Sequence, residues 1–446
     1  MTSGHLRFEF LDYAVEGRLL RLRYRLAGGR VPAVSFEERL ELPAALPAPD
    51  PSNPRCAALL SLVHLSFGVS YFKASAPQPV VAKPLAAGLA AYGDQLYTEG
   101  LGEFYFRQKL DPTGIVQFPR LTTPAVQVQP TAACAPATEE RVLVLVGGGK
   151  DSVVAREVVR HAGVAAAALS LGTAPYIERS AAVMGLEHHV VKRHLDPQLL
   201  DLNAAGARNG HVPISACVAA IAVLCAELGG FAGVVVANER SADECNATFC
   251  GLDINHQWSK SSTFEAAFTK VLNSLLVEPP AYFSLLRPLS ELAITKCFLE
   301  HPEYFEDITS CNKNFRLTDR GPVARWCGHC PKCVFVYLMA APHASAAQLQ
   351  QVFGRDFLGD EANRALLREI VGLTELKPWE CVGTVAESRS ACARLAAQGR
   401  LPPSALAVWA ECASVGADWA GVMTPEWTGS LSSLWQGRLR AYLRDH

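Results

Sequence analysis

Residues 142–152 read VLVLVGGGKDS, a run of five apolar residues followed by three glycines, a lysine, an aspartate and a serine. A continuous apolar run is typical of a strand that is buried on both faces of a sheet. Glycines let the backbone turn with its N–H groups pointing inward, and the start of a helix expected over 152–161 adds partial positive charge. The stretch therefore predicts an anion-binding loop at the carboxyl edge of a parallel sheet, where doubly wound folds bind their ligands.

The alternation of strand and helix continues outward from this loop. Apolar runs favour further strands over 165–171, 188–191 and 233–237. Helices are expected between them, over 176–184 and 214–228. This spacing predicts an α/β fold with a parallel sheet flanked by helices.

The flanking parts of the chain differ in character. Residues 1–125 are predicted to form a β-rich N-terminal domain, because 20–26 (LRLRYRL) alternates apolar side chains with three arginines on a solvated face. Proline, alanine and threonine dominate 126–139, as is typical of a linker. The parallel-sheet domain is expected over 140–340, and a helical C-terminal region rich in alanine and leucine over 341–446.

Composition excludes several classes of protein. The 446 residues include 41 Lys and Arg against 43 Asp and Glu, and a formal charge of -2 argues against a generally basic nucleic-acid binder. No run of 18 uninterrupted apolar residues occurs, and the first residues, MTSGHLRFEFLDY, lack the build of a signal peptide. We therefore expect a soluble cytoplasmic protein without a membrane or nucleic-acid partner.

The glycine loop fits neither of two common phosphate-binding patterns. A Walker A loop needs Ser or Thr after its lysine, where Asp151 stands, and a dinucleotide fingerprint needs a small third residue where Ser152 stands. The loop resembles the PP-loop of the ATP pyrophosphatase superfamily, Ser-Gly-Gly-x-Asp-Ser, with Gly147 in place of the first serine. The alternative is an ordinary helix start, in which Ser152 or Asp151 caps the helix and the glycines only turn the chain.

The PP-loop resemblance implies an adenine nucleotide alpha hydrolase-like fold and a reaction with ATP. Such enzymes split ATP between its alpha and beta phosphates, place AMP on a substrate oxygen and release pyrophosphate. By resemblance the loop and Ser152 hold pyrophosphate, and Asp151 lies near Mg²⁺. The loop residues expected to bind ATP are Gly147, Gly148, Gly149, Lys150, Asp151 and Ser152.

Four of the fourteen cysteines are spaced as metal ligands. Cys327, Cys330 and Cys333 follow a C-x2-C-x2-C pattern, and Cys311 lies sixteen residues upstream. Four thiolates converging on one tetrahedral Zn²⁺ would make a closed, structural site. His329 in place of Cys311, an iron–sulfur cluster, and a chance grouping of core cysteines are the alternatives.

The cysteine block extends the resemblance. Residues 309–333 are similar to the zinc segment of 7-cyano-7-deazaguanine synthase, a PP-loop enzyme that activates a carboxylate with ATP. The stretches 287–289 (RPL) and 295–296 (TK) are similar to a later segment of the superfamily. There the lysine lies near the nucleotide phosphates, which adds Lys296 to the expected ATP-binding residues. A surface helix lysine is the alternative.

The whole chain resembles the UDP-N-acetyl-alpha-D-muramoyl-L-alanyl-L-glutamate epimerases of peptidoglycan synthesis. This resemblance implies an enzyme that uses ATP and Mg²⁺ to invert the terminal L-glutamate of a UDP-linked muramoyl dipeptide. The UDP-sugar is expected in the N-terminal domain, near the loop 97–105. The stretches that carry the resemblance, besides the glycine loop, are 59–73, 98–105, 238–243, 256–261 and 377–384.

Inversion needs proton donors and acceptors on opposite faces of the α-carbon. His256 and Lys260 are the first candidates, because the polar stretch 238–260 follows a sheet strand and should lie over the nucleotide edge. Glu380 and Cys381 are the next. For each of them, a solvated loop residue or a core cysteine is the alternative.

Two other functions stay open at this point. A different PP-loop enzyme would form an amide, a nitrile or a thiolated product, for example on a deazapurine or a tRNA. A non-catalytic nucleotide sensor or zinc-stabilised scaffold is suggested by the serine lost at Gly147. The sequence does not fix the oligomeric state.

Overall fold

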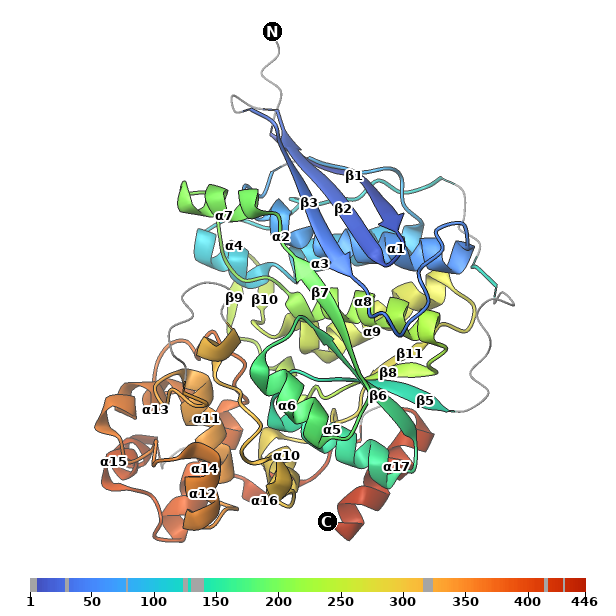
Figure 1. Cartoon of the computed structure of the whole chain (residues 1–446). Helices are drawn as coiled ribbons and strands as arrows, with labels where there is room; N and C mark the ends of the chain where they lie inside the picture. Colours follow the sequence, from blue (N-terminus) through green and yellow to red (C-terminus); the bar gives the residue numbers. More distant parts are fainter. Residues whose placement is uncertain are drawn as a thin grey trace.

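The computed structural model describes residues 6–28, 32–77, 79–122, 127–129, 140–315, 324–412, 416–427 and 430–446. One nine-stranded sheet, with strands in the order β11-β8-β5-β6-β7-β3-β2-β1-β4, organises a mixed α/β fold (Figure 1). The strands of this sheet are β1 Arg7–Glu16, β2 Leu19–Ala27, β3 Val34–Glu41, β4 Val80–Val81, β5 Arg141–Leu145, β6 Ala165–Leu171, β7 His188–His194, β8 Gly233–Val236 and β11 Ala281–Ser284. A separate hairpin consists of β9 Ala247–Phe249 and β10 Leu252–Ile254.

The strands β11, β8, β5, β6 and β7 are parallel, as the alternation of strand and helix predicts. The expected strands over 165–171, 188–191 and 233–237 are confirmed as β6, β7 and β8. The expected helices are confirmed as α5, α6 and α8. The helices of the first two thirds of the chain are α1 Pro54–Phe67, α2 Val69–Phe72, α3 Ala87–Thr98, α4 Gly102–Gln108, α5 Lys150–His161, α6 Pro175–Val183, α7 Pro197–Ala204, α8 Ile214–Gly229, α9 Ser262–Leu275 and α10 Glu291–Phe298.

The N-terminal strands extend this same sheet. Antiparallel β1, β2 and β3 join it where β3 pairs with β7, with Arg39 opposite His194. The three arginines of β2 lie on the surface face and pair with acidic side chains of β1 and β3. The domain boundaries stay predictions. Of the predicted linker 126–139, only 127–129 belong to the described residues, and the rest lies outside them.

Side chains on the two faces of the parallel strands belong to two hydrophobic cores. In β5, Val142 and Val144 lie in one core, which also contains residues of α5, α10 and α11. Leu143 lies in the other, together with residues of α1, α3, α8 and α9. This division follows from the period of two in a strand. Both faces are therefore buried, which agrees with the continuous apolar run that the sequence has here.

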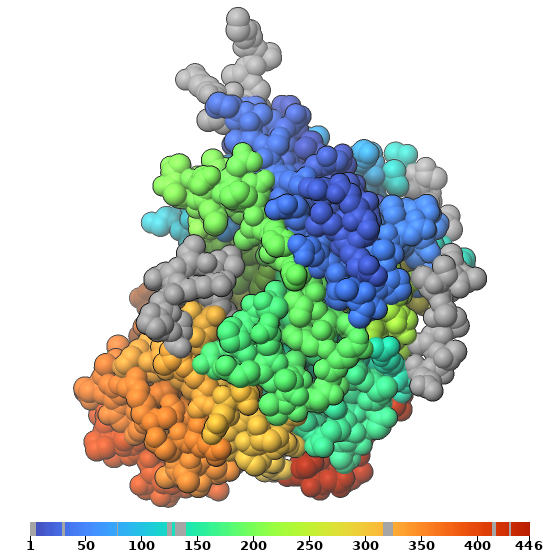
Figure 2. Space-filling model, viewed as in Figure 1, coloured from blue at the N-terminus to red at the C-terminus, as the bar shows by residue number. Residues whose placement is uncertain are grey.

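The chain after the cysteine block is helical, as predicted, and gathers beside the parallel half of the sheet (Figures 1 and 2). The last helix returns to α5, where His161 contacts Asp445. The helices of this region are α11 Pro331–Ala340, α12 Ala346–Phe353, α13 Arg364–Ile370, α14 Val385–Ala397, α15 Pro403–Cys412, α16 Trp419–Met423 and α17 Ser433–Asp445.

One stretch of the described chain, Pro54–Phe72, has the length and apolar composition of a membrane-crossing helix. It comprises α1 and α2, and 83% of it is buried inside the fold. Residues of this stretch pack against α8 within the second core. Core helices commonly pass the same test of length and composition.

Candidate active site

The glycine loop joins β5 to α5. Gly148 has a φ of 78°, in the left-handed region that favours glycine. A Cβ atom there would lie 3.3 Å from backbone atoms of Tyr176 and Ile177, so the loop passes too close to α6 for a relaxed side chain. The Thr309 N–H donates to the Gly148 carbonyl oxygen over 2.9 Å. The loop is thus held between α6 and the segment that leads to Cys311.

The first turn of α5 follows the loop directly. Its N-cap is Gly149, which has no side chain to accept from the free backbone N–H groups. The Ser152 hydroxyl donates to the Gly149 carbonyl oxygen over 2.9 Å, whereas a capping side chain would accept from a backbone N–H. The helix start is therefore suited to an anion.

Buried charges lie beside this helix start. Lys150 and Glu291 are each 1% exposed and form an ion pair, and Lys150 also pairs with the less buried Asp151. The Lys332 Nζ lies 3.4 Å from Glu291 Oε1. Burial by itself would raise the pKa of Glu291, but Lys150 and Lys332 lower it, so the carboxylate is ionised.

Three of the four predicted catalytic residues come together. His256 and Lys260 lie after β10, and Lys260 ends a short 3-10 turn, Trp258–Lys260, while Cys381 lies in the segment before α14. Burial alone would raise the pKa of the Cys381 thiol, but the charge of Lys260 and a hydrogen bond with His256 lower it to about 5. Burial alone would lower the pKa of His256, whereas its hydrogen bonds with Cys381 and Glu103 raise it to about 9. At neutral pH, Cys381 and His256 therefore form a thiolate–imidazolium pair.

Glu239 adds a second acid–base group to this cluster. It follows β8 and is 4% exposed. Burial and the nearby charge of Glu291 raise its pKa to about 7. A carboxyl group with such a pKa can give or take a proton near neutral pH.

Glu380 and Lys296 are the remaining candidates from the sequence. Glu380 is half-buried next to Cys381, and its backbone N–H donates to the Pro378 carbonyl oxygen. Lys296 donates to the His446 carbonyl oxygen over 3.0 Å, outside the group of charges around the loop. Its role in ATP binding stays a prediction.

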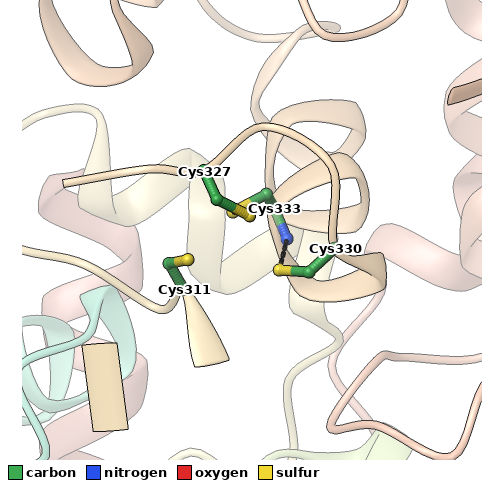
Figure 3. Close-up of side chains that lie close together, drawn as sticks. All are labelled: Cys311, Cys327, Cys330 and Cys333. Atoms are coloured by element: carbon green, nitrogen blue, oxygen red, sulfur yellow. Dashed lines mark hydrogen bonds between the residues drawn. The ribbon is translucent and has the colours of Figure 1, made fainter. Parts of the chain in front are cut away.

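The four predicted metal ligands converge (Figure 3). The sulfur atoms of Cys311, Cys327, Cys330 and Cys333 lie within 4.8 Å of one another. Four soft thiolates at such distances fit one tetrahedral Zn²⁺. The ring of His329, the alternative ligand, contacts Asn363 and Arg355.

Comparison with known proteins identifies the family. The family profiles of the MurL N-terminal domain and the MurL C-terminal domain match residues 2–285 and 307–416. Three similar proteins are named UDP-N-acetyl-alpha-D-muramoyl-L-alanyl-L-glutamate epimerase. The one from Micromonospora sp. is 42% identical to this chain, and the match covers 81% of this chain and 80% of that protein. The one from Xanthomonas oryzae pv. oryzae is also 42% identical, and the match covers 76% of this chain and 74% of that protein. The one from Salinispora tropica is 41% identical, over 81% and 79%.

The chain belongs to this epimerase family. The glycine loop, His256 and Lys260 fall in the first matched region, while Cys381 and the four clustered cysteines fall in the second. The candidate site is therefore assembled from both matched parts of a family member.

Sequence patterns did not predict several residues of the charged clusters at the candidate site. Glu103 lies on α4 and His211 lies in the segment before α8, so both contact His256 only in the folded chain. Lys332 stands between Cys330 and Cys333, so a lysine inside this C-x-x-C pattern was an available signal. Glu291 starts α10 directly after its N-cap Ser290, a place where an acidic residue is ordinary.

Arg287 joins the two loops that carry the cluster. Its guanidinium donates to the carbonyl oxygens of Glu239 and Lys260 over 2.7 and 2.6 Å, and to the Glu265 carboxylate over 3.0 Å. We expect Arg287→Met to lower the free energy of unfolding by about 3–5 kcal/mol, because it leaves a buried carboxylate without its charged partner. Urea unfolding measures this loss. Arg120→Met, which breaks a surface pair with Asp94, is the control and should cost less than about 1 kcal/mol. An equal loss of unfolding free energy in both variants would contradict the role of Arg287 in joining the two loops.

The cluster of four cysteines, as a candidate zinc site, gives a second stability prediction. Cys330→Ser should remove most of the bound zinc and lower the Tm by about 5–10 °C, because a structural metal contributes directly to folding. Elemental analysis and thermal unfolding measure the two effects. Cys250→Ser, at an exposed thiol in the β9–β10 turn, should change neither. Full zinc content in Cys330→Ser would rule out this ligand set.

Proposed function

We propose that this chain is an ATP-dependent epimerase that inverts the terminal L-glutamate of UDP-N-acetylmuramoyl-L-alanyl-L-glutamate in the synthesis of peptidoglycan precursors. The names of its relatives support the reaction and the substrate. The glycine loop between a parallel strand and a helix supports the use of ATP. The proposed place of action is the cytoplasm, where the nucleotide-linked precursor and ATP would both be available.

Activation of the carboxylate explains why such an enzyme would need ATP. An α-hydrogen beside a carboxylate is very weakly acidic, because its removal places a second negative charge next to the first. Transfer of AMP to a carboxylate oxygen, with release of pyrophosphate, removes the first charge. The α-proton can then leave to give an enolate, and a proton returns to the other face. Water finally cleaves the acyl–AMP bond, which gives the D-glutamyl product and AMP.

The residues around the loop have the chemistry for the first step. The N–H groups of the loop and of the first turn of α5 suit the pyrophosphate part of ATP. Asp151, with 25% of its side chain exposed beside the loop, offers the oxygen ligand that Mg²⁺ prefers. Bound Mg²⁺ would neutralise phosphate charge. Lys150 is held by two carboxylates, so we propose that it orients Asp151 as well as contributing charge.

The second cluster has the chemistry for proton transfer. Cys381 with His256 offers one acid–base pair, and Lys260 or Glu239 offers another. Glu380, next to Cys381 in the chain, stays a further candidate. We further propose that the UDP-sugar is held by the N-terminal part of the chain near 97–105, and that the four clustered cysteines hold a structural Zn²⁺.

The observation that carries the proposal is the electrostatic continuity of the two clusters. The charge of Cys381, followed by that of Glu239 and with a further effect of Asp151, raises the pKa of Lys260. The charges of the Cys381 thiolate and of Asp151 in the loop therefore both act on Lys260. An acyl group activated at the loop would lie within reach of groups that can move its α-proton.

One incubation tests the proposal. The purified protein is mixed with ATP, Mg²⁺ and the UDP-linked dipeptide, and the release of AMP and the chirality of glutamate after acid hydrolysis are measured. AMP together with D-glutamate is the expected result. AMP without inversion would move the ATP chemistry to another substrate, and the absence of both products would contradict the proposal.

A further inference from the structure

Glu103 touches the acid–base cluster from the N-terminal part of the chain. It lies on α4 and is 5% exposed. Its carboxylate accepts a hydrogen bond from His256 Nδ1, and the same oxygen lies 3.5 Å from His211 Nδ1. The other carboxylate oxygen accepts from Arg107, one turn further along α4. Both oxygens of a buried carboxylate are thus engaged, one of them with the histidine that bonds Cys381.

The helix that carries Glu103 also packs on the segment that carries Cys381. The rings of Phe106 and Trp379 lie 5.0 Å apart, and the guanidinium of Arg107 lies 5.3 Å from the Trp379 ring centre. Contacts of Phe106 and Arg107 with Trp379 therefore hold the helix of Glu103 against the segment of Cys381. The hydrogen bond from Nδ1 to Glu103 sets the orientation of the His256 ring and keeps a proton on Nδ1.

We propose that Glu103 is a positioning residue that keeps His256 oriented and positively charged against Cys381, so that the three residues form a carboxylate–imidazolium–thiolate relay. The inference rests on the proposed function only for its consequence in catalysis. A buried carboxylate stabilises the charged imidazole, and the charged imidazole in turn stabilises the thiolate. The relay joins α4, the segment after β10 and the segment before α14.

The alternative for these residues is a metal ion. Side-chain atoms of Glu103, His211 and His256 lie within 4.8 Å of one another. Two contacts favour the hydrogen-bonded relay. His256 Nδ1 bonds one oxygen of the Glu103 carboxylate, and the Arg107 guanidinium pairs with the other.

The other charges around His256 determine how the relay titrates. Burial and the charge of His256 lower the pKa of His211 to about 4, so His211 is neutral at physiological pH and adds no charge of its own. Burial lowers the pKa of Lys73, which lies near His211, to about 8. The titratable or charged groups that act on the relay are Lys73, Arg107, His211, Lys260 and Lys332, and Glu239 acts on Lys260.

Alkylation of Cys381 tests the relay without ATP or the dipeptide. The rate of iodoacetamide modification of the Cys381 peptide, followed by mass spectrometry from pH 4 to 9, reports the fraction of thiolate. The wild-type midpoint is expected near pH 5. Glu103→Gln keeps an acceptor for His256 but removes the charge, and should raise the midpoint by about one pH unit, which is a roughly tenfold lower rate well below the midpoint.

Two further variants make the result specific. Glu103→Asp keeps the charge and should restore part of the shift. Glu99→Gln removes the carboxylate that accepts from the Trp258 indole, outside the relay, and should leave the midpoint unchanged.

Two results would overturn the inference. One is an unchanged midpoint in a folded Glu103→Gln protein. The other is a second equivalent of metal per chain that this variant loses. Because the assay needs no turnover, failure of the relay and failure of the proposed reaction are separate outcomes.

Discussion

Asp151→Asn is expected to form pyrophosphate and AMP about 100- to 1,000-fold more slowly than the wild type, with a nearly unchanged Tm. The substitution keeps the size of the side chain but removes the charge that is proposed to hold Mg²⁺ beside the loop. Loss of one preorganised electrostatic contact to a reacting phosphate has an effect of this order. Lys150 keeps its pairing with Glu291, so the buried lysine is not left without a carboxylate. Pyrophosphate release with and without the dipeptide measures the effect.

The control for this variant is an aspartate that has no place in the loop. Asp253→Asn, in β10, removes an exposed carboxylate that accepts from Thr248 and should leave pyrophosphate formation unchanged. D-glutamate formation should fall in parallel with pyrophosphate in Asp151→Asn, because inversion follows activation. Normal pyrophosphate release in Asp151→Asn would place the nucleotide away from this loop.

The parallel half of the fold could be predicted because its signals are local. The apolar run before Gly147 and the strands over 165–171 and 233–237 depend on residues that are neighbours in sequence. The pairing of β3 with β7 was out of reach, since it joins residues about 150 positions apart and no local pattern specifies the partner of an edge strand. The N-terminal strands were therefore expected as a separate domain, although they continue the same sheet.

The candidate site divides in a similar way. The spacing of Cys327, Cys330 and Cys333 predicts a metal cluster, because the ligands lie on one short loop and the start of one helix. The environment of His256 could not be predicted, since burial and the Glu103 carboxylate come from α4 and from other distant segments. Lys296 is expected at the phosphates by resemblance, and this stays a prediction. The buried lysines that pair with Glu291 beside the loop are Lys150 and Lys332, and the position of Lys332 there depends on contacts made only in the folded chain.

Proton transfer gives the second large effect. Cys381→Ser is expected to keep pyrophosphate formation within a few-fold of the wild type, while incorporation of deuterium at the glutamate α-carbon in D2O falls by about 100- to 10,000-fold. Burial alone would raise the pKa of the Cys381 thiol, but Lys260 and His256 lower it to about 5, so the thiol is ionised at neutral pH. A serine hydroxyl is not ionised there and cannot replace the thiolate as a base. Mass spectrometry of the recovered dipeptide measures the exchange, and Cys245→Ser, at an exposed thiol, is the matched control.

The same pair fixes the pH range of the exchange. Below about pH 5 the Cys381 thiolate takes up a proton, and above about pH 9 His256 loses its charge, so the ion pair exists between these values. Wild-type exchange should therefore fall at both ends of this range, while Cys381→Ser should lose the acidic limb of the profile. If Cys381→Ser exchanges deuterium as fast as the wild type, the proton must be moved by other groups, of which Lys260 and Glu239 are the nearest with suitable charge. If exchange is lost as expected, retained pyrophosphate formation in Cys381→Ser separates a loss of proton transfer from a damaged loop.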